Sequence, residues 1–167
     1  MALREISRCI PCELSSSREL ASVIVSITTI IEGYVDGLVD VSVRDSPVGE
    51  TRFGALLIQD RRDDFKGTWK WRFDLLRVFS LQCDDEGVRR FRLLIELRNA
   101  IVHGGGSLTD RQAGSLVKQL ALQRDLASVF CVDFDGRRCI FDTASVRRSI
   151  DVGCQFVLGT DELAMRK

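Results

Sequence analysis

Apolar residues recur at steps of three and four positions along most of the chain, and this spacing predicts amphipathic helices. The first helix is expected over about 17–40, with Ser16 as its N-cap and Glu19 at the capping-box position. The further helices are expected over 50–64, 68–81, about 85–103, 107–130 and 142–158. The apolar side chains expected to face inward from the second and third of these helices are Phe53, Leu56 and Leu57, and Trp69, Phe73, Leu76 and Phe79.

The period changes near the end of the chain. Residues 131–141 alternate around Asp135 and Gly136, which is typical of a tight β-hairpin. The tail after Gly159 is expected to be loose. The pattern therefore predicts an all-α fold, an antiparallel bundle of five to six helices with a small β-hairpin near 131–141. We expect one domain over 1–167, with its core at about 17–158.

Composition changes this picture little. Hydrophobic residues make up 45% and charged residues 29%, and 24 basic residues balance 24 acidic ones, so net charge points to neither nucleic acid nor an anionic membrane. Only four of the basic residues are lysines and twenty are arginines. Arginine suits phosphate geometry better than lysine does, although a general bias in composition accounts for the same excess.

The sequence predicts a cytoplasmic protein without a membrane segment. The apolar run Val23–Ile31 is interrupted by Ser26, Thr28 and Thr29, so it is too short and too polar to span a bilayer. The first residues lack the order of a signal peptide.

Six cysteines are present. Cys9 and Cys12 form a lone CxxC without a preceding strand, which argues against a redox motif, and a zinc site would need two more ligands at suitable spacing. We expect reduced, partly buried thiols and no metal.

The only histidine of the chain, His103, ends a helix just before three glycines, Gly104–Gly106. Arg98 lies five residues earlier, so the two side chains should point about 140° apart, whereas Asn99 shares the face of His103. Both side chains lie near a helix C-terminus, where the dipole favours positive charge.

This combination fits one kind of chemistry. RNA cleavage by transesterification needs no metal, because the ribose 2′-OH attacks the adjacent phosphorus; a histidine can move the protons and an arginine can stabilise the phosphorane charge. The three glycines are not followed by the Lys-Ser/Thr pair of a phosphate-binding loop, and no cofactor motif is present, so no cofactor is expected.

The segment Arg98–His103, with its polar Asn99, resembles the Arg-polar-x3-His motif of the HEPN superfamily, and the resemblance extends in helix order over about residues 17–158. The resemblance implies a helical bundle that dimerises, with two motifs forming one composite site. It implies metal-independent endoribonuclease activity by Arg98 and His103, with Asn99 assisting, in a toxin–antitoxin or anti-phage setting. RNA is then the substrate, and an antitoxin or other regulatory protein is a possible partner.

One position departs from the family pattern. A toxin subgroup carries a tyrosine two residues after the histidine, where a partner enzyme modifies it, and here that position is Gly105. Two other interpretations stay open: a catalytically inactive HEPN-like module that binds a partner protein or a nucleotide, and an unrelated helical interaction domain in which His103 only caps a helix.

Overall fold

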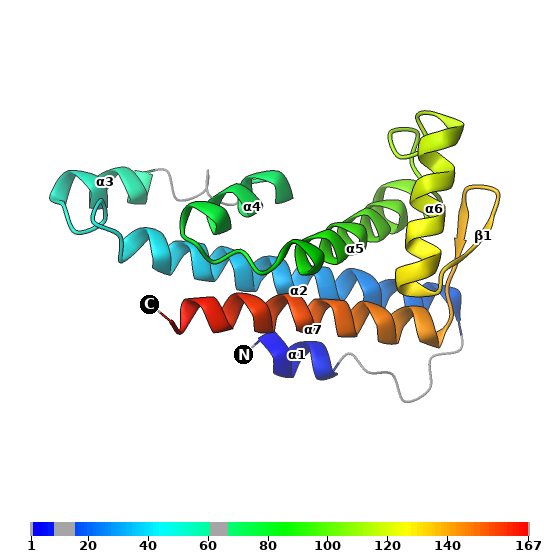
Figure 1. The fold of residues 1–167 in the computed structure, drawn as a ribbon, viewed down its shortest axis with the longest axis horizontal. Helices are drawn as coiled ribbons and strands as arrows, with labels where there is room; N and C mark the ends of the chain where they lie inside the picture. Colours follow the sequence, from blue (N-terminus) through cyan, green and yellow to red (C-terminus); the bar gives the residue numbers. More distant parts are fainter. Residues whose placement is uncertain (1, 9–15, 61–66, 167) are drawn as a thin grey trace.

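The computed structural model describes residues 2–8, 16–60 and 67–166, without the side chains of 7, 8 and 57–60. It confirms an all-α helical bundle with a small hairpin (Figure 1). The elements of the described part are α1 Ala2–Arg8, α2 Ser17–Arg44, α3 Arg52–Asp60, α4 Trp69–Val78, α5 Asp85–Gly104, α6 Leu116–Phe130, β1 Asp133–Asp135, β2 Arg138–Ile140 and α7 Thr143–Ala164.

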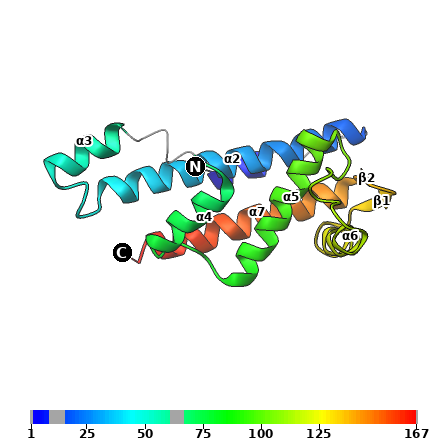
Figure 2. The same cartoon turned by 90° about the horizontal axis from the view of Figure 1, so that it is seen from above.

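The centre of the molecule consists of α2, α5 and α7, which pack against one another. The two long helices α2 and α7 run side by side, and α5 crosses them (Figures 1 and 2). The buried face of α2 has the predicted spacing and includes Leu20, Ile24, Ile27, Ile31 and Val35. Complete burial of one such side chain stabilises the fold by about 1.5–3 kcal/mol.

The predicted capping box at the start of α2 is present. The Glu19 backbone N–H donates to Ser16 Oγ over 3.3 Å, and the Ser16 backbone N–H donates to Glu19 Oε2 over 3.2 Å. Two N–H groups that the helix itself leaves unpaired are thus satisfied. By length and composition alone α2 could also cross a membrane. The core helix of a bundle has the same length and apolar composition, and one face of α2 does pack in the bundle.

Aromatic side chains join α4, α5 and α7. The rings of Phe91 and Phe156 stack with centroids 4.0 Å apart, and Phe73 meets both edge-on at 6.3 and 6.2 Å. Trp69 lies against Phe91 at 4.9 Å and is partly buried. The aromatic residues expected to face inward from 68–81 therefore contribute to the core, as predicted.

Gly153 allows α2 and α7 to approach closely. A Cβ atom at this position would lie 2.9 Å from Ile31 Cδ1 and 3.0 Å from Ile27 Cγ2, so both isoleucine side chains would have to shift to admit it. Elsewhere between these helices, the Tyr34 hydroxyl donates to Asp161 Oδ1 over 2.5 Å. Burial and this carboxylate raise the pKa of Tyr34, which keeps the hydroxyl protonated as a donor.

Several predicted boundaries were wrong. The helix expected from 107 begins at Leu116, after a Ser115 N-cap, because 107–114 forms turns tied to α5 and the hairpin. The chain after Gly159 is not loose, since α7 continues to Ala164 and buries Thr160. The core also extends before residue 17, because Ala2 and Ile6 of α1 are buried.

The second predicted helix is only partly confirmed. It spans Arg52–Asp60, and the expected end over 61–64 and the side chain of Leu57 lie outside the described residues. Phe53 and Leu56 are 77% and 60% exposed, so they do not face a core. The reason is position: α3 contacts the far end of α2, away from the main bundle (Figure 1).

The close approach at Gly153 gives a test of the bundle. We predict that Gly153→Ala lowers the free energy of unfolding by up to about 2 kcal/mol, because overpacking against Ile27 and Ile31 costs about 1–3 kcal/mol and outweighs the gain of about 0.5–1 kcal/mol from alanine within a helix. Gly33 on α2 is exposed with no atom within 4 Å of its ideal Cβ, so Gly33→Ala should stabilise by about 0.5–1 kcal/mol. Urea unfolding measures both, and a Gly153→Ala variant as stable as the wild type would contradict this packing.

Candidate active site

The candidate site lies on the side of α5 that the core leaves uncovered. Phe91, Leu94, Leu97 and Ala100 of this helix are buried. Four polar residues occupy a sector of about 60° on another side, as helical spacing requires. They are Arg92, Glu96, Asn99 and His103.

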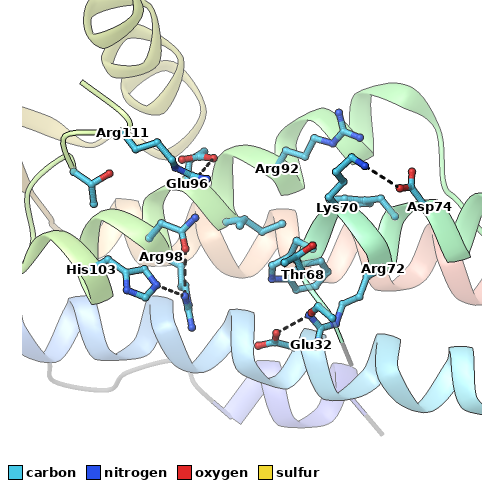
Figure 3. A pocket seen from close by; sticks show the side chains of 16 residues that line it. Glu32, Thr68, Lys70, Arg72, Asp74, Arg92, Glu96, Arg98, His103 and Arg111 are labelled. Atoms are coloured by element: carbon cyan, nitrogen blue, oxygen red, sulfur yellow. Dashed lines mark hydrogen bonds and ion pairs between the residues drawn. The ribbon is translucent and has the colours of Figure 1, made fainter. Parts of the chain in front are cut away.

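Arg98 and His103 meet, and the prediction that they point apart was wrong. Arg98 Nη1 lies 3.1 Å from His103 Nε2 and donates to Asn99 Oδ1 over 3.2 Å (Figure 3). The Cα–Cβ directions do diverge on an ideal helix, but the long arginine side chain curves back along the helix surface. All three predicted site residues are therefore joined in one hydrogen-bonded group.

The contact restricts the role of the imidazole nitrogen. A guanidinium can only donate hydrogen bonds, so a hydrogen bond between Arg98 Nη1 and His103 Nε2 requires Nε2 to be the acceptor. His103 is exposed, while Arg98 and Asn99 are partly buried. An unprotonated, accessible nitrogen is the form that a general base requires.

Glycine conformations and backbone hydrogen bonds fix the C-terminal end of α5, next to His103. Gly105 adopts a left-handed conformation with φ of 59°, and the N–H of Gly106 (φ of 90°) donates to the carbonyl of Ala100 over 3.0 Å. The carbonyl of Gly106 accepts from Cys139 over 2.8 Å, and Leu108 donates to the carbonyl of Arg137 over 2.9 Å. The glycines therefore end the helix and join its C-terminus to the β-hairpin.

A cleft of about 1020 Å³ opens beside the Arg98–His103 pair and reaches from α5 to α4 and α2. In Figure 3 the pair lies beside α2, whereas Lys70 and Asp74 of α4 lie near Arg92 of α5. The cleft is large enough for a ligand of several rings.

Arg72 attaches the α4 wall of this cleft to α2. Its side chain is buried, and its guanidinium pairs with Asp36 at 2.7 Å and with Glu32 at 2.9 Å and donates to the Gly67 carbonyl. Burial disfavours its charge, but the hydrogen bonds and the two carboxylates raise the pKa of Arg72 above its ordinary value. Removing one partner of such a pair typically costs about 3–5 kcal/mol.

Most other cations at the cleft also have carboxylate partners. Lys70 pairs with Asp74, and Arg111 pairs with Glu96, both at 3.7 Å. Among the residues that the structure describes, Arg92 and Arg98 have no ion pair, and Arg92 lies over the Phe73 ring at 4.9 Å. Two guanidinium groups and His103 are thus available to an anion.

Gln112 holds the turn that follows the glycines against α5. Its buried amide donates to the carbonyl and to the carboxylate of Glu96 over 2.8 and 2.7 Å. Its carbonyl oxygen accepts from both the N–H and the hydroxyl of Thr109 over 3.0 Å. This network fixes Glu96 and the Thr109 side of the cleft.

The sequence did not reveal Arg72, Arg92, Glu96, Arg111 or Gln112 as site residues. Spacing on α5 could have placed Arg92 and Glu96 on the face of His103, since they lie eleven and seven residues before it. The other three reach the cleft through turns and tertiary packing, for which the sequence carries no local pattern.

None of the four described cysteines lines this cleft. Cys83, Cys131, Cys139 and Cys154 are free thiols, and burial raises the pKa of Cys83 and Cys139 to about 11. In the described part of the chain, no three His, Cys, Asp or Glu side chains form a group that could hold a metal ion. The Cys9–Cys12 pair lies outside the described residues.

Comparisons with protein-family models, with curated proteins and with solved structures found no match to this chain. The geometry of the cleft is therefore the basis for a proposed function.

We predict that mutation of Gln112 changes the stability of the protein much more than mutation of Arg98 or His103. Gln112→Ala should lower the free energy of unfolding by about 1–3 kcal/mol, since it leaves buried partners unpaired. Arg98→Ala and His103→Ala should change it by less than about 0.5 kcal/mol, because neither side chain fills the core. Urea unfolding of the three variants measures this difference. A large loss of stability in His103→Ala would mean that the histidine is structural.

Proposed function

We propose that this protein is a metal-independent endoribonuclease that cleaves RNA by attack of the ribose 2′-OH on the adjacent phosphorus. The observation that carries the proposal is the Arg98–His103 contact of 3.1 Å at an open cleft, with Asn99 in the same group. The resemblance of Arg98–His103 to the HEPN motif agrees with it.

The proposed reaction begins when a phosphate enters beside the pair. Arg98 turns from His103 to two phosphate oxygens, which a planar guanidinium can bind together. Nε2 of His103 is then free to take the proton of the 2′-OH.

The reaction forms the bond from the 2′-oxygen to phosphorus and breaks the bond from phosphorus to the 5′-oxygen of the next nucleotide. Arg98 stabilises the extra negative charge on the phosphorane, and the departing 5′-oxygen takes a proton from a second group, the protonated His103 of another copy. The products carry a 2′,3′-cyclic phosphate and a 5′-hydroxyl.

We propose a homodimer with a composite site. One histidine can accept the first proton, but a second proton donor is needed at the departing oxygen, and the chain has no other histidine. A two-fold axis near His103 would bring a second Arg98–His103 pair to the same phosphate. This setting fits a cytoplasmic toxin or antiviral defence enzyme with an antitoxin or other regulatory protein as a further partner.

A catalytically inactive module that binds a partner protein or a nucleotide is the second candidate. Zero net charge favours it, because RNA binders gain much of their affinity from phosphate contacts. Exposed Leu116, Val117 and Leu120 on one side of α6 also favour a protein partner.

The first functional prediction concerns the pair itself. Arg98→Ala and His103→Ala should each lower the cleavage rate of a single-stranded RNA by about 10²–10⁴-fold, because each removes a group that acts on the transition state. Arg98→Lys should restore little, since lysine keeps the charge without the planar fork. Single-turnover cleavage of a labelled strand measures the rates.

Two features of the substrate control this experiment. A strand with a 2′-methoxy group at the scissile position, or a DNA strand, should stay intact. If both alanine variants fold normally and cut as fast as the wild type, the pair is not the active site and the binding module becomes the better account.

The second prediction concerns metal ions. Cleavage should continue at an unchanged rate in excess chelator, because the proposed chemistry uses only protein groups and the 2′-OH. The same strand is incubated with and without chelator. Activity lost in chelator and restored by magnesium would show that the mechanism is wrong.

The third prediction concerns assembly. Light scattering at micromolar concentration should give twice the chain mass of 18.8 kDa, since the composite site needs two copies. A mixture of Arg98→Ala and His103→Ala chains tests whether the two copies share a site. A monomer that cleaves RNA at full rate would contradict the composite site.

A further inference from the structure

A second hollow of about 390 Å³ lies beside the main cleft, toward the start of α5. Arg92 and Glu96 line both spaces, so the two are neighbours along one helix. The second hollow is also lined by Arg77 of α4 and Gln82 of the segment between α4 and α5. A ligand in the main cleft can therefore extend past Arg92 into this hollow.

Two arginines that line this hollow are free to bind an anion. Arg77 and Arg92 are exposed, and in the described chain neither forms an ion pair. Arg89, in contrast, pairs with Glu86 at 2.7 Å. Because Arg92 already rests on the Phe73 ring at 4.9 Å, little side-chain freedom is lost when it binds a phosphate.

Gln82 supplies an unused acceptor. Its Oε1 is buried and accepts no hydrogen bond from any described residue. A buried acceptor of this kind normally has a partner, since leaving it unpaired costs about 1–3 kcal/mol. Val88, which is buried, and Leu93, which is partly buried, add apolar surface to the lining of the hollow. A flat, partly apolar ligand with an N–H group would contact this apolar surface and pair with Gln82 Oε1.

We propose that the second hollow is a nucleotide subsite for the RNA strand whose scissile phosphate lies at Arg98 and His103. Arg92 and Arg77 hold a neighbouring phosphate, and the partly buried Gln82 side chain turns toward the hollow so that its Oε1 accepts a hydrogen bond from an N–H of the base. This inference rests on the proposed function.

The spacing along α5 agrees with such a strand. Arg92 and Arg98 are six residues apart, which is about 9 Å along the helix axis, and stacked nucleotides rise by about 3.4 Å each in one strand. The two arginines are thus far enough apart for different phosphates. The carboxylate residues Asp85, Glu96 and Asp125 also line the hollow and repel a phosphate, so we expect the phosphate to lie at the unpaired Arg77 and Arg92.

Binding of a strand that cannot be cleaved tests the subsite. The probe is a fluorescein-labelled ten-nucleotide RNA with 2′-methoxy groups throughout, and anisotropy gives the Kd over a range of salt concentrations. Arg77→Ala and Arg92→Ala should each raise the Kd about tenfold and lower the salt slope by about 0.7, the value for one phosphate of a single strand. Arg148→Ala removes an exposed arginine of α7 outside both spaces and should change neither quantity.

The role of Gln82 has its own readout. Gln82→Leu should reduce any preference among four homopolymer strands while it leaves the salt slope unchanged, because it removes base recognition but no charge. A stability measurement accompanies each variant, and a Gln82→Leu protein that is folded but keeps the full preference overturns this role.

The outcomes separate this inference from the cleavage proposal. Weaker binding in Arg77→Ala and Arg92→Ala but not in Arg148→Ala supports the subsite, even if the protein never cuts a natural RNA strand. Equal binding by all four proteins overturns the subsite and leaves the Arg98–His103 proposal standing if cleavage is observed. A protein that binds no strand at all overturns the subsite as well.

Discussion

The burial of one face of α5 between α2 and α7 is the constraint on which the rest of the structure depends. Phe91 stacks on Phe156 of α7, and Leu94, Leu97 and Ala100 are fully buried. Once this face is fixed, the helical repeat determines where every other residue of α5 points. The polar residues that remain are presented to one side of the helix, where α4 and the turn after Gly106 enclose them.

This arrangement separates stability from chemistry. The groups that hold the cleft together are paired and buried, as the Arg72 guanidinium between Asp36 and Glu32 and the Gln112 amide on Glu96 show. The groups that can act on a ligand are less buried: His103 is exposed, and Arg98 is partly buried. The contact between them costs little to open, because water can reach it from the side of His103.

Sequence patterns predicted the fold better than the site. Helical period and caps located α2, α4, α5 and α7, because a core face and an N-cap are local properties of the sequence. The start of α6 was missed because Gln112 ties the preceding turn to Glu96, a contact between residues sixteen apart. The meeting of Arg98 with His103 was missed because a helical wheel gives the direction of Cβ and not the reach of a long side chain.

Nuclear magnetic resonance of the imidazole tests the proposed site most directly, and its signals are unambiguous because His103 is the only histidine. Nitrogen shifts of the free protein should show the neutral tautomer with its proton on Nδ1 and Nε2 accepting from Arg98. Addition of the 2′-methoxy RNA strand should move the Nε2 signal as Arg98 transfers to a phosphate, and the Arg98→Ala protein should lack the initial contact. If the strand binds and the His103 signals do not move, the RNA lies elsewhere and the central claim is contradicted.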